Sequence, residues 1–374
     1  MNDQCWQLTD DLGPEKILYV YNNDVGMKGI IVVDNVSAGP SIGGVRMASD
    51  VTLEECVRLA RAMTLKNAAA ALPHGGGKSV IFADPKSDAK TKESIVRAFA
   101  VAIRDFVDYI PGPDMGTNEE CMAWVKDEIG RSVGLPAEMG GIPLDEIGAT
   151  GYGLMISIKA AQKYSDVGLD RARVAVQGFG SVGQHAARFL MQEGSILVGA
   201  ADSRGTVVDQ EGLDVEQLID HKQRTGTVCG FEPGQTLGSD SILDVECDIW
   251  IPAARPDVVR VENVNRLKTK LIAEGANIPI THEAEQKLAE QGVAIIPDFI
   301  ANAGGVICAA VEYHNGTKTA AFSAIEDKIS QNTVEMFELV KSRDITPRLA
   351  ANELAQQRVR RATSFRRWGK QISL

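Results

Sequence analysis

Two lysines, Lys66 and Lys78, stand where amines could take part in chemistry. Lys66 lies near the end of an amphipathic stretch, and Lys78 follows Gly75-Gly76-Gly77 and precedes an apolar run. A lone lysine is more often a solvated surface charge. An amine held among small and apolar residues instead has a lowered pKa and can act as a base. Glycine removes side-chain bulk and permits positive φ, so we expect these glycines to fold tightly around a small ligand.

A carboxylate that could exchange protons with such an amine is present at Asp114, in the loop-like stretch 111–116. Thr117 and Glu120 follow it with the spacing of a capping box, which predicts a helix N-terminus there. Backbone N–H groups at that position favour the ionised form of a nearby carboxylate. The alternative interpretation is that Asp114 only caps the helix.

The segment around these groups has the periodicity of a mixed α/β domain. Thr52 and Glu55 form a capping box, and the residues after them predict a helix that ends near Pro73, with Lys66 late in it. The stretch 37–46 is glycine-rich and reads as a loop, and Lys78 lies at the entry of a strand. The other elements expected here are strands at 16–21, 29–34 and 79–84 and a helix at 91–108.

From about Thr150 onward, strand and helix patterns alternate, which predicts a parallel, doubly wound sheet. Its strands are expected at 173–177, 195–201, 247–251, 270–273 and 293–296. We therefore expect an α/β fold with three parts and an active-site cleft between the first two. These parts are a substrate-binding and oligomerisation domain (1–148), a Rossmann-type domain (149–330), and a C-terminal helical segment (331–374) that packs back on the first domain.

A glycine turn marks the expected cofactor site. Its residues are Gly178, Phe179, Gly180, Ser181, Val182 and Gly183. They follow a short apolar strand and open a helix, and Asp202 ends the next strand, as in a dinucleotide-binding fingerprint. Asp202 should repel a 2′-phosphate, which favours NAD, whereas Ser203 and Arg204 could bind one. NAD is therefore the favoured cofactor, and NADP stays open.

Composition and charge argue against several other classes. A net charge of −11 disfavours a general nucleic-acid or anionic-membrane role. The one basic tract, at 358–370, could bind nucleic acid or could be a helix docked on the body or on another subunit. Six scattered cysteines and five histidines show no metal-binding spacing, so no metal site is expected. No secretory signal and no transmembrane span are visible, which makes the cytoplasm the default location.

The chain resembles the glutamate/leucine/phenylalanine/valine dehydrogenase family over roughly residues 35–315. The matching stretches occur in the family's order. They are Gly39-Pro40 through Gly43-Gly44-Val45-Arg46, Met63 to Asn67, Gly75 to Lys78, Asp114-Met115-Gly116, Ala149 to Gly153, Gln177 to Gly180, and Asn302 to Val306.

The resemblance implies reversible oxidative deamination of an L-amino acid to the 2-oxo acid and ammonia by a homo-oligomer. By motif position, Lys66 looks like the residue that pins the substrate α-carboxylate. Lys78 looks like the lysine that activates water, and Asp114 looks like the proton shuttle to the substrate nitrogen. The further cofactor contacts that the resemblance suggests are Thr150, Ala253, Ala254, Asn277 and Asn302.

Departures from the glutamate pattern bear on the substrate. Glutamate-specific members carry a lysine where this chain has Ile42, and a serine where it has Ala309. The side-chain carboxylate of a glutamate substrate would therefore lose both its cation and its hydroxyl donor in this chain. Burying that carboxylate unpaired would cost on the order of several kcal/mol of binding free energy. The remaining substrate contacts expected are Gly43, Gly44, Gly112 and Val306. We therefore expect an apolar substrate side chain, with bulky and aromatic ones among the candidates. Glutamate dehydrogenase activity and a catalytically silent NAD-binding regulator are the alternatives.

Overall fold

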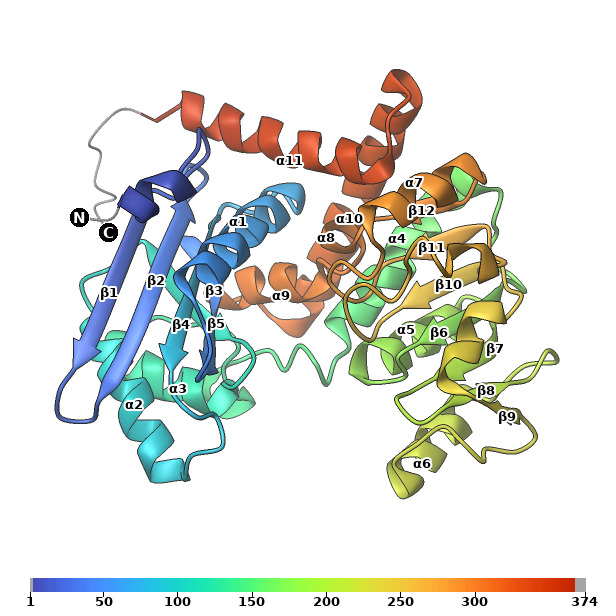
Figure 1. The fold of residues 1–374 in the computed structure, drawn as a ribbon, viewed down its shortest axis with the longest axis horizontal. Helices are drawn as coiled ribbons and strands as arrows, with labels where there is room; N and C mark the ends of the chain where they lie inside the picture. The colour runs from blue at the N-terminus through green and yellow to red at the C-terminus, as the bar shows by residue number, and fades with distance from the viewer. Residues whose placement is uncertain (1–2, 367–374) are drawn as a thin grey trace. The chain divides into compact units, whose positions relative to one another are not determined.

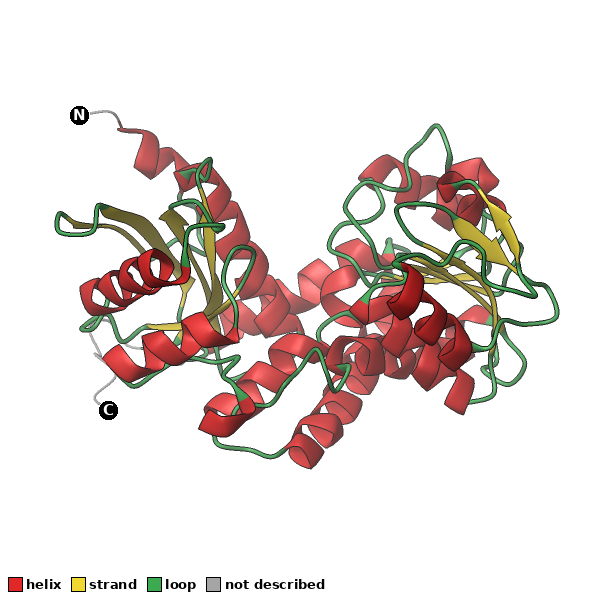
Figure 2. Cartoon of the chain, turned by 90° about the horizontal axis from the view of Figure 1, so that it is seen from below, coloured by secondary structure: helices red, strands yellow, loops and turns green. Residues whose placement is uncertain are grey.

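The computed structural model describes residues 3–366, and these form two compact units (Figure 1). Unit 1 comprises the chain up to Pro143, Val306–Ala321 and the chain from Asn352 onward. Unit 2 comprises Leu144–Gly305 and Phe322–Ala351. Each unit has one sheet with helices on both of its faces (Figure 2), so the expected α/β class is confirmed. The C-terminal part of the chain contributes residues to both units.

Unit 1 contains a mixed five-stranded sheet in the order β1-β2-β4-β3-β5. The antiparallel pairs are β1 with β2 and β2 with β4, and the parallel pairs are β3 with β4 and β3 with β5. The strands are β1 (Lys16–Asn22), β2 (Met27–Asn35), β3 (Ser41–Ala48), β4 (Gly75–Phe82) and β5 (Tyr109–Pro113).

Two apolar layers cover the faces of this sheet. Val80 of β4 packs with Cys56, Val57 and Ala60 of α1 (Leu53–Ala69). Its neighbour Ile81 packs on the other face, against α2 (Ala89–Ala102) and α3 (Glu119–Ile129). Because side chains alternate along a strand, Lys78 lies on the α1 face with Val80.

The glycines before Lys78 correct one prediction. They belong to β4 rather than to a loop, and none of the three has positive φ. A Cβ on Gly76 would lie 1.9 Å from the backbone nitrogen of Thr64, and one on Gly75 would lie 1.8 Å from the carbonyl oxygen of Asn35. These glycines are therefore required by the close packing of α1 and β2 against β4. They place Lys78 inside a strand and not at its entry.

Two other predicted loops are also strands. The stretch 37–46 contains most of β3, and the stretch 111–116 begins inside β5. Both were misassigned because glycine and proline are typical of turns. Here Gly43 allows close strand pairing, since a Cβ on it would lie 1.7 Å from the carbonyl oxygen of Gly77.

Unit 2 contains a seven-stranded sheet in the order β12-β11-β10-β6-β7-β8-β9. The five predicted strands are its parallel part, and β8 and β9 extend one edge in antiparallel pairing. The strands are β6 (Arg173–Gln177), β7 (Ile196–Ala201), β8 (Thr206–Val208), β9 (Gln235–Leu237), β10 (Ile249–Pro252), β11 (Leu271–Ala273) and β12 (Ala294–Ile296). The strand order reverses between β6 and β10, which is where doubly wound sheets bind ligands.

Helices enclose this sheet. The helices α4 (Ala149–Ser165) and α5 (Ser181–Gln192) contact each other and pack on the sheet, α4 on β11 and β12 and α5 on β6 and β7. The helix α7 (His282–Glu290) packs against β12, and α6 (Val215–Thr225) contacts α5. The short helix α8 (Asp298–Ala301) follows β12. The 3-10 turns of the chain are Asp3–Leu8, Ala137–Met139, Ser239–Asp244 and Val264–Arg266.

Three C-terminal helices complete the chain, namely α9 (Gly304–Tyr313), α10 (Lys318–Arg343) and α11 (Pro347–Ser364). In unit 1, the carboxylate of Glu312 on α9 accepts hydrogen bonds from the backbone nitrogens of Leu135 and Ile142, at 3.1 and 2.8 Å. Arg358 of α11 donates to the carbonyl oxygens of Ala68 and Ala69 at the end of α1. Arg367 and Lys370 of the basic tract lie outside the described residues. None of the helices among residues 3–366 is long and apolar enough to cross a membrane.

Candidate active site

Lys78 and Asp114 meet in unit 1. The Nζ atom of Lys78 lies 2.6 Å from Oδ2 of Asp114, and the Lys78 residue is 5% exposed. Asp114 follows the last residue of β5, while Lys78 lies in the middle of β4. The intervening strand β3 contributes Gly44, which has no side chain to cover the pair. The predicted amine and carboxylate therefore form one ion pair.

Arg46 is a third member of this cluster that the sequence analysis did not single out. Its Nε donates to Oδ2 of Asp114 at 3.0 Å, and its NH1 donates to Oε1 of Glu55 at 2.5 Å. Strand alternation could have found it, because Gly44 and Arg46 are two residues apart on β3 and so share one face. The carboxylate of Asp114 is thus shared by two cations.

Burial governs the protonation of this cluster. Desolvation lowers the pKa of Lys78 below its ordinary 10.5, and the opposing pull of Asp114 is not enough to restore it. Burial alone would raise the pKa of Asp114, but the charges of Lys78 and Arg46 outweigh it and leave that pKa below 3.8. The site therefore combines a carboxylate that is ionised beside the charged Lys78 and Arg46 with an amine that gives up its proton more readily than a solvated lysine.

The helix that follows Asp114 begins differently from the prediction. Its N-cap is Asn118, whose side chain accepts from the backbone nitrogen of Cys121 at 3.0 Å. Thr117 instead accepts from the backbone nitrogen of Asp114 and donates to the carbonyl oxygen of Val45. Thr117 thus fixes the backbone at Asp114, and the carboxylate of Asp114 is turned to Lys78 and Arg46 rather than used as a cap. The other predicted cap is present, since Thr52 accepts from the backbone nitrogen of Glu55.

The expected substrate contacts all lie in unit 1. Lys66 is half-buried in the last turn of α1, the helix that packs on β4. Ile42 is 4% exposed and shares the Gly44 face of β3. Gly112 pairs with Gly44, and a Cβ on Gly112 would lie 3.0 Å from Cγ2 of Val133. The remaining expected contacts are Gly43 on β3 and Val306 and Ala309 on α9.

The glycine turn of unit 2 has the geometry of a dinucleotide loop. Gly178 has φ of 97°, and a Cβ on it would lie 2.7 Å from the backbone of Ala253 and Ala254. A Cβ on Gly183 would lie 2.2 Å from the carbonyl oxygen of Gly178, so α5 packs directly on the turn. Gly180 is exposed with open space beside it, and no side chain caps α5 there. The backbone nitrogens of Gly178 and Phe179 donate to the carbonyl oxygen of Ala201, and the N–H groups of Ser181 and Val182 in the first turn of α5 are placed to bind an anion.

Polar side chains gather at the ends of the neighbouring strands. Asn302 donates from Nδ2 to Oδ1 of Asn277 at 3.1 Å and to the carbonyl oxygen of Gly275 at 3.3 Å. The Oδ1 atom of Asn302 and Oε1 of Gln177 are buried without a hydrogen-bond partner in the described part of the chain. Thr150 lies beside Gly304 and Gly305, which come shortly after Asn302 in the sequence. A Cβ on Gly305 would be 3.4 Å from Oγ1 of Thr150. Unpartnered amide oxygens of this kind fit a bound ligand that supplies N–H donors.

Asp202 occupies the predicted place at the end of β7, but its carboxylate is engaged. Oδ2 accepts from Nζ of Lys222 at 3.1 Å and from the backbone nitrogen of Val228 at 2.8 Å, and Oδ1 accepts from the backbone nitrogen of Arg204 at 2.9 Å. Ser203 and Arg204 are exposed. Lys222 therefore offsets the charge that was expected to repel a 2′-phosphate.

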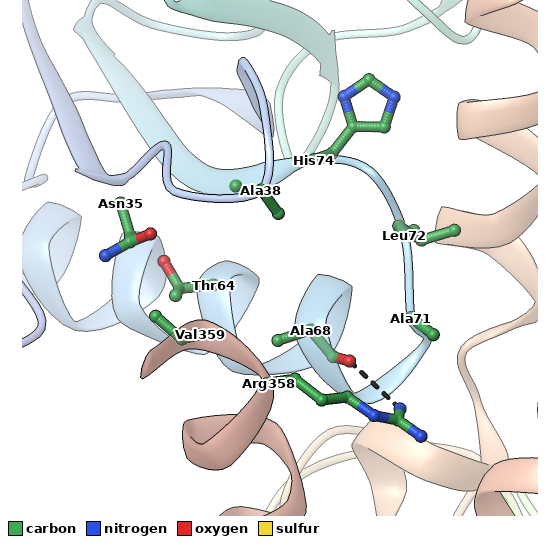
Figure 3. Close-up of a pocket in the computed structure, with 10 residues that line it drawn as sticks. Asn35, Ala38, Thr64, Ala68, Ala71, Leu72, His74, Arg358 and Val359 are labelled. Carbon is green, nitrogen blue, oxygen red and sulfur yellow. Dashed lines mark hydrogen bonds between the residues drawn. The ribbon is translucent and has the colours of Figure 1, made fainter. Parts of the chain in front are cut away.

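A cavity of about 320 Å³ in unit 1 is separate from these groups (Figure 3). Its walls include Thr64 and Ala68 of α1, Leu72, and Arg358 and Val359 of α11. None of the predicted site residues lines it. Its ionisable lining residues are His74 and Arg358, and the predicted amine and carboxylate lie elsewhere in unit 1.

Comparison with known proteins identifies the family. The model of the glutamate/leucine/phenylalanine/valine dehydrogenase family matches residues 140–367, and that of the family's dimerisation domain matches residues 14–131. The chain belongs to this family. It is an amino acid dehydrogenase, an oxidoreductase that acts on CH–NH₂ donors.

Individual relatives differ in their named specificity. The chain is 38% identical to a glutamate dehydrogenase of Aeropyrum pernix, with 89% of this chain and 85% of that protein covered. It is 36% identical to an NADP-specific glutamate dehydrogenase of Saccharolobus shibatae (89% and 83% covered) and 34% identical to an NAD-specific one of Staphylococcus aureus (89% and 85%). Its fold matches L-tryptophan dehydrogenase from Nostoc punctiforme with a TM-score of 0.76, 25% identity, and 96% and 99% coverage. Both nicotinamide dinucleotides thus occur among its relatives, as expected.

Proposed function

We propose that the chain catalyses the reversible oxidative deamination of an L-amino acid with an apolar side chain, using NAD or NADP. The observation that carries this proposal is the ion pair of the buried Lys78 with Asp114. The buried residue at position 42, on the same face of the sheet, is the apolar Ile42 and not a further cation beside Lys78 and Arg46. The glycine turn 178–183 and Asn302 would hold the dinucleotide, which would supply a hydride acceptor for the substrate Cα. The chain's own residues must orient the substrate and move its protons.

The proposed roles are those that the family resemblance implies, and the charge and burial of Lys78 and Asp114 support them. Lys66 binds the substrate α-carboxylate. Lys78, with its lowered pKa, removes a proton from the water that attacks the imino carbon. Asp114, ionised and adjacent, exchanges a proton with the substrate nitrogen. Arg46 keeps Asp114 ionised while Lys78 changes its protonation state.

An apolar substrate is supported by the apolar residues at the two positions where a second carboxylate would need partners. The family position that pairs with the glutamate side chain is Ile42 here, and the position of the hydroxyl donor is Ala309. Arg46, the other cation on this face of β3, is committed to Asp114 and Glu55. An unpaired buried carboxylate costs on the order of several kcal/mol.

Glutamate is the second candidate substrate, favoured by the names of the relatives at 34–38% identity. The named substrate of the Nostoc punctiforme protein supports a bulky apolar side chain instead. Ala309 has the small side chain that such a substrate needs, whereas the space beside Gly112 is already occupied by Val133. The family's dimerisation domain and a hetero-hexameric glutamate dehydrogenase among the similar structures support an oligomer, which we propose for this chain without a stated number of subunits.

The cofactor choice depends on the charge around Asp202. Its carboxylate disfavours a 2′-phosphate, but Lys222 lies 3.1 Å away, and Arg204 is exposed beside it. We propose NAD as the preferred cofactor, with measurable activity on NADP.

Reductive amination of a panel of 2-oxo acids tests the proposal. 2-Oxoglutarate, 4-methyl-2-oxopentanoate, phenylpyruvate and indolepyruvate are supplied with ammonia, and oxidation of NADH and of NADPH is followed separately. We expect kcat/KM to be highest for one of the three apolar acids. A dominant preference for 2-oxoglutarate would replace the apolar substrate with glutamate.

A further inference from the structure

One guanidinium in unit 2 binds three buried carboxylates. Arg348, in the first turn of α11, donates from NH2 to Oε2 of Glu274 at 2.6 Å, from Nε to Oε1 of Glu285 at 2.5 Å, and from NH1 to Oδ1 of Asp298 at 2.9 Å. The side chains of these acids are 0%, 5% and 8% exposed. They come from three different elements, because Glu274 follows β11, Glu285 lies in α7, and Asp298 begins α8 (Figure 1).

The same carboxylates fix two backbone segments at the carboxyl edge of the sheet. Glu274 accepts from the backbone nitrogen of Asp298 at 2.9 Å, which ties the end of β11 to the start of α8. Asp298 accepts from the backbone nitrogen of Ile278 at 2.9 Å. Ile278 has φ of 47°, a conformation that a β-branched residue adopts only when its surroundings hold it. The turn 275–278 is therefore maintained by contacts that end at Arg348.

These two segments carry the polar groups described above. Asn277 lies in the turn, and Asn302 immediately follows α8, where its backbone nitrogen donates to the carbonyl oxygen of Asp298 at 2.7 Å. Their side chains are joined at 3.1 Å, and Oδ1 of Asn302 is left without a partner among the described residues. Displacing either segment would break this arrangement.

We propose that Arg348 is a positioning residue that clamps Glu274 and Asp298 and thereby holds Asn277 and Asn302 where they bind the dinucleotide. This rests on the proposed function, in which both asparagines are dinucleotide contacts. Arg348 itself lies on α11, far along the chain from the glycine turn, and belongs to none of the motifs that suggested the cofactor site.

The charges in this cluster indicate that Arg348 serves to fix geometry rather than to stabilise the fold. Three carboxylates face one guanidinium, and burial raises the pKa of Glu274 well above its ordinary value and that of Glu285 above its own. Buried ion pairs contribute little net stability compared with apolar packing of the same volume, although losing one partner is costly. Directional bonds from a planar guanidinium, in contrast, fix geometry.

The test compares three variants with the unmodified protein. Arg348→Lys keeps the positive charge and loses the three-way fork, and Arg348→Met removes the charge. Arg266→Met is the matched control, because Arg266 also pairs with an acid of unit 2 (Asp244, 2.7 Å) but contacts neither segment. The readouts are the dissociation constant of NADH and NADPH from fluorescence titration without amino acid, hydrogen exchange of residues 275–278, and the KM values for dinucleotide and amino acid.

We expect the Arg348→Lys variant to fold and to show faster hydrogen exchange at residues 275–278. Its dissociation constant for the dinucleotide should rise by at least about tenfold, which is on the order of one lost charge-assisted hydrogen bond. The KM for dinucleotide should rise and that for amino acid should not, and Arg266→Met should match the unmodified protein. If Arg348→Met fails to fold, Arg348→Lys still decides the question. Unchanged exchange at 275–278 in Arg348→Lys overturns the clamp, and unchanged dinucleotide affinity overturns its positioning role. Failure of the unmodified protein to bind either dinucleotide would contradict the proposed function, while the exchange measurement would still judge the clamp.

Discussion

A methyl group added at Gly44 should disable the site while leaving the fold intact. A Cβ on this residue would lie 2.7 Å from Cβ of Asp114 and 3.1 Å from Nζ of Lys78. Ordinary van der Waals contact begins near 3.4 Å, so Asp114 or the strand must move by roughly 0.7 Å. Gly44 does not have positive φ, and alanine therefore adds no backbone strain.

The expected effect follows from the precision that proton transfer requires. A misplacement approaching 1 Å costs about 10²-fold in rate, which corresponds to about 2.7 kcal/mol of the barrier. We expect Gly44→Ala to lower kcat/KM for the preferred amino acid by about that factor, with a melting temperature close to that of the unmodified protein. Gly168→Ala is the control, since Gly168 is exposed with open space around the position of its Cβ. Activity of a folded Gly44→Ala enzyme at the unmodified level would refute the assignment of the Lys78–Asp114 pair.

Three further predictions concern substrate, pH and cofactor. Ile42→Lys should raise kcat/KM for 2-oxoglutarate relative to that for apolar 2-oxo acids by about 10–100-fold, which is the effect of one new ion pair. An unchanged ratio would show that residue 42 does not contact the substrate side chain. Arg46→Met should shift the rising limb of the pH profile of kcat/KM to higher pH. The reason is that the charge of Arg46 lowers the pKa of Lys78, so that this pKa rises when Arg46 is replaced. A shift of the limb to lower pH would contradict this prediction. Lys222→Met should increase the ratio of the activity with NAD to that with NADP, because the carboxylate of Asp202 loses its counter-charge. Steady-state rates measured with each dinucleotide give this ratio. The same ratio in the variant and the unmodified protein would show that Lys222 does not take part in cofactor selection.

Unit 2 was largely predictable because its parallel strands are mostly buried. The strand 173–177 was placed at its observed bounds, and the helix expected after the glycine turn is α5. Apolar runs that alternate with amphipathic helices are a strong local signal. The antiparallel strands β8 and β9 were missed because β8 has only two apolar residues and β9 is mostly exposed, so neither carries a clear apolar run.

Unit 1 was harder to predict because its glycines serve packing rather than turns. Gly43, Gly75 and Gly76 lie in strands whose neighbours approach too closely for any Cβ, and composition alone does not distinguish this case from a loop. The amine at Lys78 and the acid at Asp114 were found from their flanking residues. Arg46 and Arg348 were missed because each acts through contacts with residues that are distant in sequence or lie on another strand.

The central claim is that the buried amine of Lys78 moves the protons of the reaction. Its most direct test is the kcat of Lys78→Ala for oxidative deamination, measured with a fluorescence titration that shows the variant still binds the dinucleotide. We expect kcat to fall by about 10²–10⁴-fold, the contribution of a positioned general base, with dinucleotide affinity unchanged. Turnover by Lys78→Ala at the rate of the unmodified enzyme would contradict the account.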